Sequence, residues 1–393
     1  MKQKLLFVMN NLNCGGAEKA LVSLFETLDY TRFEVDLLLF KQEGMFMAQL
    51  PRQVRLLPEP KEFRYYDMPI QQAVLGSLKS GRPDITLSRL RAGYVFKSEK
   101  NSVRCEQRVW KYIAKSLPQL EKTYDIAVGY LEKNPIYFCI DKVKAKKTIG
   151  FIHNDYNKLG MDPDLDRKYF HRLDYLVTVS EECGHILRER FPEFRHKVEV
   201  MHNIISPAAI HKLSGTSIQW RGQEVHLLSV GRLNPQKGFE LAIEACRELV
   251  QGGYPVQWSV IGEGEDRAKL QRKIDKYGLQ NHFHLLGLKE NPYPYIKEAD
   301  IYVQPSRFEG KSIAIDEAKI LQKPIVVTNF PTAKDQITHG VNGWVAEMNP
   351  KALSQAIRTL LDDERLRRRL QQSLADETLG TESEINKLYA MFN

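Results

Sequence analysis

The chain lacks long apolar stretches, closely spaced cysteines and repeated or low-complexity segments. No run of about 18 apolar residues occurs, so no ordinary membrane-spanning helix is expected. The five cysteines are scattered and odd in number, which suits neither a disulfide framework nor a zinc site and favours a reducing compartment. The apolar segment Leu5–Met9 is too short for a secretory signal, and we interpret it as a buried strand.

The length and composition are those of a globular protein. At 393 residues, with 42% hydrophobic and 27% charged residues, the chain has room for two α/β domains. Its net charge is +8, and between Lys61 and Lys122 thirteen Lys and Arg outnumber six Asp and Glu. A solvated helical face, an anionic membrane or an anionic polymer would each account for this charge. Nucleic acid fits less well, because no recognition motif accompanies the charge.

Short apolar runs alternate with amphipathic helical segments, which is typical of βαβ units and parallel sheets. Two such series occur. The predicted strands are Leu5–Met9, Val35–Phe40, Ile126–Val128, Thr148–Ile152, Leu176–Val179 and Val198–Val200 in the first, and His226–Val230, Trp258–Ile261, Phe283–Leu286, Ile301–Val303, Ile325–Thr328 and Trp344–Val345 in the second.

The sequence therefore predicts an α/β protein with two doubly wound, Rossmann-like domains that face a central cleft. Residues 1–205 form the first domain, residues 206–224 lose the periodicity as a linker does, and residues 225–380 form the second domain. A last helix at 381–393 is expected to pack back on the first domain. Ligands of such sheets bind at the carboxyl ends of the strands, so motifs that directly follow strands matter most.

Two glycine-containing motifs follow strands. Gly15 and Gly16 come after the first strand and open a helix, where glycine lets a ligand approach the backbone and the helix N-terminus attracts phosphate. A tight turn without a ligand is the alternative. Gly262 and Gly264 end a strand of the second domain, where a nucleotide pocket and a plain turn are equally good interpretations.

A third loop carries two cations. Gly231 and Arg232 follow the first strand of the second domain, and Lys237 lies five positions beyond Arg232. The planar guanidinium and the mobile ammonium together suit a diphosphate clamp. Two solvated loop cations are the alternative.

The segment Pro305–Ala318 is the most informative. It places Glu309 in a loop and Glu317 within a helix for which Ser312 is a candidate N-cap. Carboxylates at these two places can accept hydrogen bonds from hydroxyl pairs on two sugars, while the N–H groups from Gly310 to Ser312 face a polar ligand. An unpaired Glu317 among apolar residues would be costly.

These motifs together resemble those of the family-4 retaining glycosyltransferases of the GT-B architecture, the bacterial glycosyl transferases group 1, over essentially the whole chain. The segment from Glu309 to Glu317 is similar to the family's E-x7-E signature. The loop with Arg232 and Lys237 is similar to the family's diphosphate clamp. Gly15 and Gly16 are similar to its N-terminal glycine loop.

The resemblance implies roles for individual residues. Glu309 would bind hydroxyls of the donor sugar, helped by backbone N–H groups around Lys311 and Ser312, and Glu317 would bind the ribose. Many family members have Glu-Gly-Phe-Gly here, whereas this chain has Lys311 after Gly310, so Lys311 can alter the choice of sugar or contact phosphate.

The resemblance extends to the base and to the sugar. Leu288, after Gly287, lies where the family holds the base through main chain, and His153 is similar to a family histidine that contacts the sugar. A core or loop histidine without a ligand is the alternative for His153. Asn154 stands where many members have Asp directly after the histidine.

The expected activity is retaining transfer of a hexosyl or N-acetylhexosaminyl group from a nucleotide-sugar, with a UDP-sugar favoured. Arg232 and Lys237 would stabilise the leaving diphosphate, His153 would assist, and neither a metal nor a cofactor is expected, since the nucleotide-sugar is a substrate. Three alternatives stay open: a metal site at Asp162, Asp164 and Asp166, a sugar-nucleotide epimerase, and a non-catalytic protein that binds anionic glycans or lipids.

The acceptor is the least defined partner. We expect a lipid-linked or polymeric glycan of a bacterial cell-wall polysaccharide or teichoic-acid pathway, reached from the cytoplasm at the inner face of the membrane, with Glu132 and Lys133 facing it. The residues expected to hold the chain at an anionic membrane are basic and aromatic: Arg64, Tyr65, Tyr66, Arg89, Arg91, Tyr94, Phe96 and Lys97.

Overall fold

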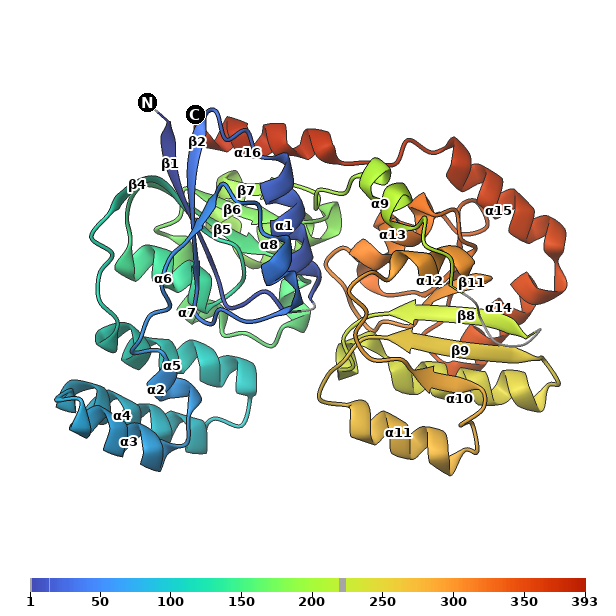
Figure 1. The fold of residues 1–393 in the computed structure, drawn as a ribbon, viewed down its shortest axis with the longest axis horizontal. Helices are drawn as coiled ribbons and strands as arrows, with labels where there is room; N and C mark the ends of the chain where they lie inside the picture. The colour runs from blue at the N-terminus through green and yellow to red at the C-terminus, as the bar shows by residue number, and fades with distance from the viewer. Residues whose placement is uncertain (1, 14, 219–223) are drawn as a thin grey trace. The chain divides into compact units, whose positions relative to one another are not determined.

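A computed structural model describes residues 2–13, 15–218 and 224–393. The chain divides into two compact units (Figure 1). The first contains Met1–Asn13, Ala17–His202 and Ser383–Asn393, and the second is built on Asn203–Glu382. Part of the predicted linker forms helix α9 (Pro207–Leu213), but residues 219–223 lie outside the described residues, so the linker's bounds remain a prediction.

The first unit holds a parallel sheet with the order β3-β2-β1-β4-β5-β6-β7. Its strands are β1 (Gln3–Met9), β2 (Phe33–Leu39), β3 (Val54–Leu56), β4 (Thr123–Gly129), β5 (Lys144–Ile152), β6 (Tyr175–Thr178) and β7 (Val198–Val200). Leu5 lies opposite Val35 on one side and Ile126 on the other. Because the strand order reverses between β1 and β4, the loops after these two strands diverge at the edge where such folds bind ligands.

The helices of the first unit cover the faces of this sheet and extend beyond it. They are α1 (Gly16–Thr27), α2 (Arg64–Asp67), α3 (Ile70–Lys79), α4 (Pro83–Ser98), α5 (Ser102–Ser116), α6 (Asn134–Lys142), α7 (Pro163–Phe170), α8 (Glu181–Arg190) and α16 (Ile385–Phe392). Trp110 and Tyr137 are completely buried in the unit's core. The Phe33 ring of β2 lies 5.2 Å from that of Tyr389 and 5.5 Å from that of Phe392, so α16 completes this core.

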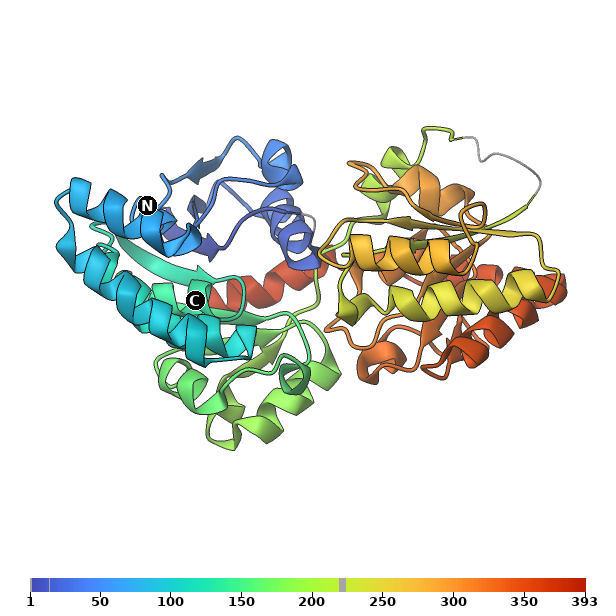
Figure 2. The same ribbon diagram turned by 90° about the horizontal axis from the view of Figure 1, so that it is seen from below.

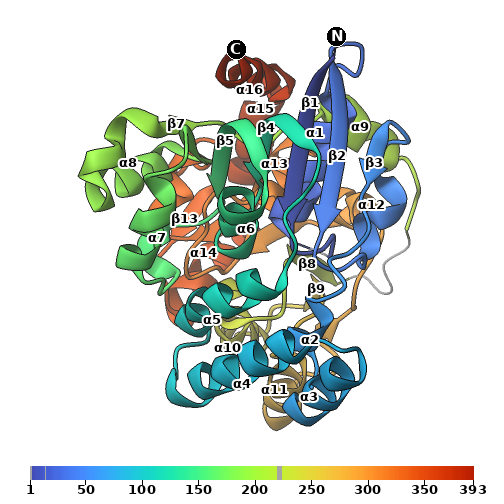
Figure 3. The same cartoon turned by 90° about the vertical axis from the view of Figure 1, so that its left-hand side faces the viewer.

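Helices α2 to α5 lie between β3 and β4 in the sequence and gather at one end of the first unit (Figure 3). Here the structure corrects part of the predicted membrane surface. Tyr65, Tyr66 and Arg89 are buried, and Arg89 donates to the Tyr65 and Met68 carbonyl oxygens at 2.9 and 3.1 Å. These three side chains bind the helices together and do not face outward.

The second unit holds a parallel sheet with the order β10-β9-β8-β11-β12-β13. Its strands are β8 (Val225–Val230), β9 (Val256–Ile261), β10 (Phe283–Leu285), β11 (Ile301–Gln304), β12 (Ile325–Thr328) and β13 (Trp344–Ala346). Its further helices are α10 (Phe239–Gln251), α11 (Arg267–Lys276), α12 (Tyr293–Glu298), α13 (Ile313–Ile320), α14 (Pro350–Asp362) and α15 (Glu364–Asp376). Helices α10 and α11 lie on one face of the sheet and α12 and α13 on the other (Figure 1). The predicted fold of two Rossmann-like domains is confirmed.

Candidate functional site

The order of strands in the second sheet reverses between β8 and β11, and the loops after these strands meet there. The Arg307 N–H donates to the Gln236 carbonyl at 2.8 Å, and Gln236 Nε2 donates to the Phe308 carbonyl at 3.0 Å. Gly238 has a φ of 64°, and a Cβ there would lie 2.1 Å from the Pro305 carbonyl oxygen. Only glycine permits this approach, which brings the predicted diphosphate loop against the predicted sugar-binding loop.

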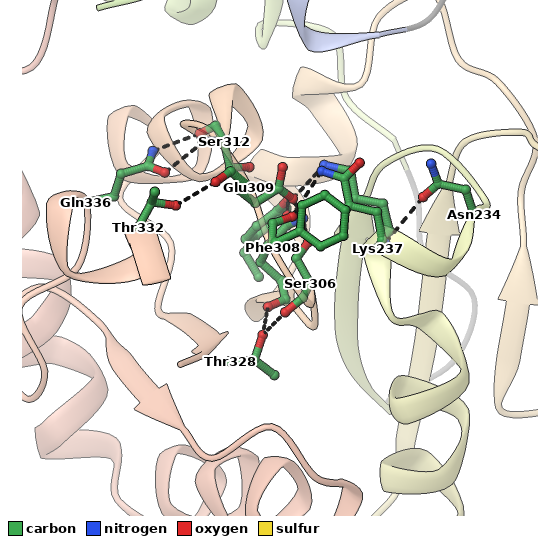
Figure 4. Close-up of polar contacts among 12 residues, drawn as sticks. Asn234, Lys237, Ser306, Phe308, Glu309, Ser312, Thr328, Thr332 and Gln336 are labelled. Carbon is green, nitrogen blue, oxygen red and sulfur yellow. Dashed lines mark hydrogen bonds and ion pairs between the residues drawn. The ribbon is translucent and has the colours of Figure 1, made fainter. Parts of the chain in front are cut away.

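The approach of the loops pairs Lys237 with Glu309. Lys237 Nζ lies 2.6 Å from Glu309 Oε1, and Figure 4 shows the two side chains reaching toward each other from their separate loops. The same oxygen accepts from Ser306 Oγ at 2.6 Å and from Gln304 Nε2 at 3.1 Å. Among the described residues no hydrogen bond reaches Glu309 Oε2. One oxygen of this buried carboxylate is thus fixed, and the other is available to a ligand hydroxyl.

A buried polar chain orients Glu309, and the sequence prediction did not include it. Tyr302 Oη donates to Gln304 Oε1 at 2.6 Å, which turns the Gln304 amide nitrogen toward Ser306 and Glu309. Thr332 Oγ1 donates to the Glu309 carbonyl at 3.0 Å. The sequence signal for this chain was Gln304, a polar residue at the end of an otherwise apolar strand. Its contact with Glu309 could not be identified without the fold.

Ser312 occupies the N-cap position of α13 without making a side-chain cap bond. Its N–H donates to Gln336 Oε1 at 2.9 Å, and Gln336 Nε2 donates to the Ser312 carbonyl and to Asp316 Oδ1, each at 2.8 Å. The predicted hydroxyl cap is absent, and the Gln336 amide instead binds both the backbone N–H and the backbone carbonyl of Ser312 (Figure 4). In this structure the Ser312 N–H is directed to Gln336, whereas we expected it to face a ligand.

Lys311, the departure from the family pattern, is mostly buried. Its Nζ lies 3.9 Å from Asp316 Oδ2, and Asp316 also accepts from Gln336. Lys311, Asp316 and Gln336 thus form one polar cluster against the first turn of α13. Whether a donor sugar or phosphate contacts Lys311 stays a prediction.

The remaining predicted donor residues lie in helix α13 and on neighbouring loops of the same unit. Glu317 is buried and accepts from Tyr293 Oη at 3.2 Å, so it has the partner that its burial requires. The Gly262 N–H donates to the Gly287 carbonyl at 3.0 Å, which joins the loops after β9 and β10 just before the exposed Leu288.

The other glycines and Arg232 lie beside these groups. The Gly231 N–H donates to the Ile261 carbonyl at 3.0 Å, so the loop after β8 is tied to β9. Gly264 leaves no room for a Cβ beside the Leu233 carbonyl, and Arg232 is exposed directly after Gly231. Gly310 follows Glu309 in the turn before α13. The predicted donor-binding residues of the second unit thus lie around the carboxyl ends of β8, β9, β10 and β11.

His153 follows β5 in the first unit and has no hydrogen bond to either ring nitrogen within the described residues. The ring is buried, with its centroid 4.9 Å from that of Tyr130 and 5.7 Å from that of Phe151. Burial lowers the pKa of His153 to about 4, so the imidazole is neutral at neutral pH. Two buried, unsatisfied nitrogens are costly in a core, and a polar ligand would satisfy them.

Glu132 and Lys133, the predicted acceptor contacts, already have partners. Glu132 is buried, and its Oε1 accepts from the His153 N–H at 2.7 Å, while burial raises the pKa of its carboxyl. Lys133 forms an ion pair with Glu106 and has a φ of 69°. Glu132 therefore supports the backbone of His153. Gly15 and Gly16 follow β1, the strand beside β4.

The three aspartates of the alternative metal site serve separate structural roles. Asp162 accepts from the Asp164 N–H at the start of α7, and Asp164 pairs with Arg167. Asp166 is fully buried, accepts from Tyr137, Tyr156 and Gln107, and has its pKa raised to about 6 by burial. The described part of the chain contains no cluster of three or more His, Cys, Asp or Glu residues arranged for a metal ion.

Within residues 2–13, 15–218 and 224–393, no helix has the length and apolar character needed to cross a membrane.

Comparison with known proteins places the second unit in a family. Residues 216–375 match the glycosyl transferases group 1 family. The amylovoran biosynthesis glycosyltransferase AmsK of Erwinia amylovora is 35% identical over 35% of each chain. The poly(glycerol-phosphate) alpha-glucosyltransferase of Bacillus subtilis is 24% identical over 76% of this chain and 47% of its own. For the first three curated relatives, the match spans 35% to 43% of their length.

A solved structure covers nearly the whole chain. HepE of Anabaena in complex with UDP-glucose has a TM-score of 0.68 at 17% identity, over 99% of this chain and 98% of its own. Such a likeness establishes the fold, which agrees with the two parallel sheets described above. Residues 216–375 are therefore a domain of the glycosyl transferases group 1 family, in a chain with the two Rossmann-like domains of the GT-B fold.

Proposed function

We propose that this protein is a retaining glycosyltransferase that moves a hexosyl or N-acetylhexosaminyl group from a nucleotide-sugar, preferably a UDP-sugar, to a cell-surface glycan acceptor. The observation that carries this proposal is the junction of Lys237 and Glu309 at the strand-order reversal of the family-matched unit. A cation for the diphosphate and an open carboxylate oxygen for the sugar hydroxyls stand side by side there. The likeness in fold to a protein in complex with UDP-glucose supports a UDP-sugar.

In the proposed reaction, Arg232 and Lys237 stabilise the charge that builds on the diphosphate as the anomeric C–O bond breaks. Fixed cations aimed at developing charge are usually the largest contribution available to such a site. The acceptor hydroxyl attacks the anomeric carbon from the face that the diphosphate leaves, and its proton passes to a diphosphate oxygen. Configuration is retained without a protein nucleophile, and neither a metal ion nor a cofactor takes part.

The first unit would bind the acceptor. His153 of the same unit, whose ring nitrogens are unsatisfied within the described residues, would instead contact the transferred sugar, and Glu132 fixes the backbone that presents His153. We propose a lipid-linked or polymeric acceptor, met from the cytoplasm at the inner face of the membrane. The names of two relatives, one in amylovoran biosynthesis and one acting on poly(glycerol-phosphate), support a bacterial surface glycan as the acceptor class.

A screen of UDP-, GDP- and ADP-sugars by thermal shift, followed by mass spectrometry of products formed with lipid-extract acceptors, tests this function. We expect one nucleotide-sugar to stabilise the protein and to lose its sugar to an acceptor, with activity that survives EDTA. The Glu309→Gln variant should still bind the free nucleoside diphosphate, but it should bind the nucleotide-sugar no more tightly than the diphosphate. Failure of every nucleotide-sugar to bind would overturn the proposal, and conversion of the nucleotide-sugar without an acceptor would indicate an epimerase.

A further inference from the structure

Large apolar side chains are exposed on the outward side of α3 and α4. Leu75, Leu78, Leu87, Leu90 and Tyr94 have exposed fractions of 60%, 52%, 50%, 50% and 74%. With Ile70 and Phe96 they account for seven of the ten exposed large hydrophobic residues in the described chain. We call Leu75, Leu78, Leu87, Leu90 and Tyr94 the α3–α4 outer face. Clusters of exposed apolar residues of this kind mark interaction sites more often than chance exposure does.

The inward side of the same helices carries mostly small and polar residues, and Ile85 is the one large aliphatic side chain among those counted as buried in α3 and α4. Ser77 and Thr86 share a buried hydrogen bond of 2.7 Å, and Ser88 and Arg89 are also buried. A helix that only covers a core has its apolar stripe inward and its cations outward. Here cations other than Arg89 point outward as expected, but five large Leu and Tyr side chains point outward with them, so the apolar outer face is not explained by packing within the unit.

The outer face is continuous across the two helices. A Cβ at Gly93 of α4 would lie 2.7 Å from Ile70 Cδ1 of α3, so the helices are in close contact, and Figure 2 shows them side by side in light blue. Leu87, Leu90 and Tyr94 are spaced by three and four residues, which places them on one stripe of α4.

The same helices and the residues just after them also expose cations that form no ion pair in the described part of the chain. Lys79, Arg91, Lys97 and Lys100 form no ion pair within the described residues, and all four are exposed. The nearby acids already have ion-pair partners: Glu62 and Asp84 share Arg82, Glu99 pairs with Arg108, and Asp67 pairs with Lys41. The α3–α4 region therefore exposes both large apolar side chains and positive charges that form no ion pair with any described residue.

We propose that the α3–α4 outer face docks on an anionic lipid bilayer, with Leu and Tyr side chains inserted at the interface and the free cations at the headgroup phosphates. A second copy of this chain fits less well, because a symmetric contact would bring like charges together. Anionic headgroups match the charge, because each Lys or Arg near such a surface strengthens binding. The proposal gives a surface to the membrane association assumed in the proposed function, but vesicle binding needs no donor or acceptor.

Co-sedimentation of the full-length protein with vesicles tests the apolar part of the face. At low salt we expect binding to vesicles of phosphatidylcholine with 30% phosphatidylglycerol, and at least about tenfold weaker binding of the L87Q/L90Q/Y94Q variant. The L213Q/V341Q control removes exposed apolar side chains elsewhere and should bind as the wild type does. A wild-type protein that stays in the supernatant would overturn the proposal, as would equal binding of the triple variant.

The charged part is tested in the same assay. R91Q/K97Q should weaken binding to the anionic vesicles about tenfold or more, with little effect on the residual binding to pure phosphatidylcholine. The R365Q/R369Q control removes two exposed cations from α15 and should bind normally. Each variant must keep the wild-type circular dichroism melt and nucleotide-sugar thermal shift, which separates failure of this surface from failure of the donor site. A dimer in sedimentation velocity that only L87Q/L90Q/Y94Q abolishes would identify a second copy as the partner instead.

Discussion

Glu309 has one saturated and one open carboxylate oxygen, because Lys237, Ser306 and Gln304 all donate to Oε1. The orientation of this side chain is therefore set by the protein before any ligand arrives. Such preorganisation reduces the cost of ordering the site when the donor binds. At the scale of residues, the groups that hold Glu309 matter as much as Glu309 itself.

Removing the Ser306 hydroxyl should loosen Glu309. Ser306→Ala deletes a hydrogen bond to a charged group, and we expect about fivefold to tenfold weaker binding of the nucleotide-sugar. Binding of the free nucleoside diphosphate should not change, because Lys237 remains. Titration calorimetry with both ligands measures the difference.

Ser354→Ala is the matched control, since it removes another Ser–Glu hydrogen bond of a buried serine, the 2.5 Å contact to the partly buried Glu248, away from the donor loops. If it weakened nucleotide-sugar binding as much as Ser306→Ala, the positioning role of Ser306 would be refuted.

His153 makes the stability of the first unit depend on pH. Its folded pKa of about 4 lies below the ordinary value of 6.5, so the unfolded chain takes up a proton first as pH falls. The stability contribution of neutral His153 is thus complete above pH 6.5 and is lost between pH 6.5 and 4. From pH 7.5 to 5, the wild type should lose about 2 kcal/mol of unfolding free energy relative to His153→Leu.

Urea unfolding of both proteins, followed by limited proteolysis of the first unit at each pH, gives this difference. The exposed His185 is the control, and His185→Gln should follow the wild-type curve. Parallel curves for the wild type and His153→Leu would show that burial does not depress the pKa of His153.

At the scale of elements, two loops meet because β8 and β11 are neighbours in the sheet although they are far apart in the sequence. Gly238 governs how closely the loops approach, since its Cα faces the Pro305 carbonyl oxygen. The contact between Lys237 and Glu309 depends on that approach. Backbone packing, and not side-chain identity alone, therefore builds the site.

Gly238→Ala should separate the loops. Gly278→Ala is a matched control, because Gly278 has a similar φ of 67° but nothing within 4 Å of an added Cβ. Both variants carry the left-handed backbone cost of roughly 1–2 kcal/mol. Only Gly238→Ala should weaken nucleotide-sugar binding by about tenfold or more in the thermal-shift titration. Equal affinities of the two variants would contradict this account.

The sequence predicted regular elements well where the apolar runs were long. β1 and β8 are largely buried strands of parallel sheets and appear as clear apolar runs. β5 was predicted only over its apolar end, Thr148–Ile152, because it begins with lysines, and β3 has three residues, none of them buried, and was not predicted. Glu309 and Lys237 were found because their motifs are local. Gln336 was not, because its function in the structure depends on contact with a peptide 24 residues away.

At the scale of the whole molecule, the chain returns to its first unit at the end. Helix α16 packs on β2 through Tyr389 and Phe392, and Tyr389 Oη accepts from the Asp29 N–H at 2.9 Å. The second unit is thus inserted between the body of the first unit and the helix that completes its core. Damage to the C-terminal helix should therefore affect the first unit.

Phe392→Ala should destabilise the first unit by about 3–5 kcal/mol, the usual range for a buried Phe. Hydrogen exchange of the full chain should accelerate in β2 and α16 but not in β8 to β12. Leu374→Ala, a buried change on α15, is the reciprocal control and should accelerate exchange in the second unit only. Faster exchange of the second unit in Phe392→Ala would contradict the assignment of α16.

The central claim is that Lys237 stabilises the leaving diphosphate beside Glu309. The most direct test is the turnover of Lys237→Met at saturating nucleotide-sugar, with Lys276→Met, an exposed lysine at the end of α11, as the control. The account predicts a loss of about 10²–10³ in turnover for Lys237→Met and none for the control. Near-wild-type turnover of Lys237→Met would contradict it.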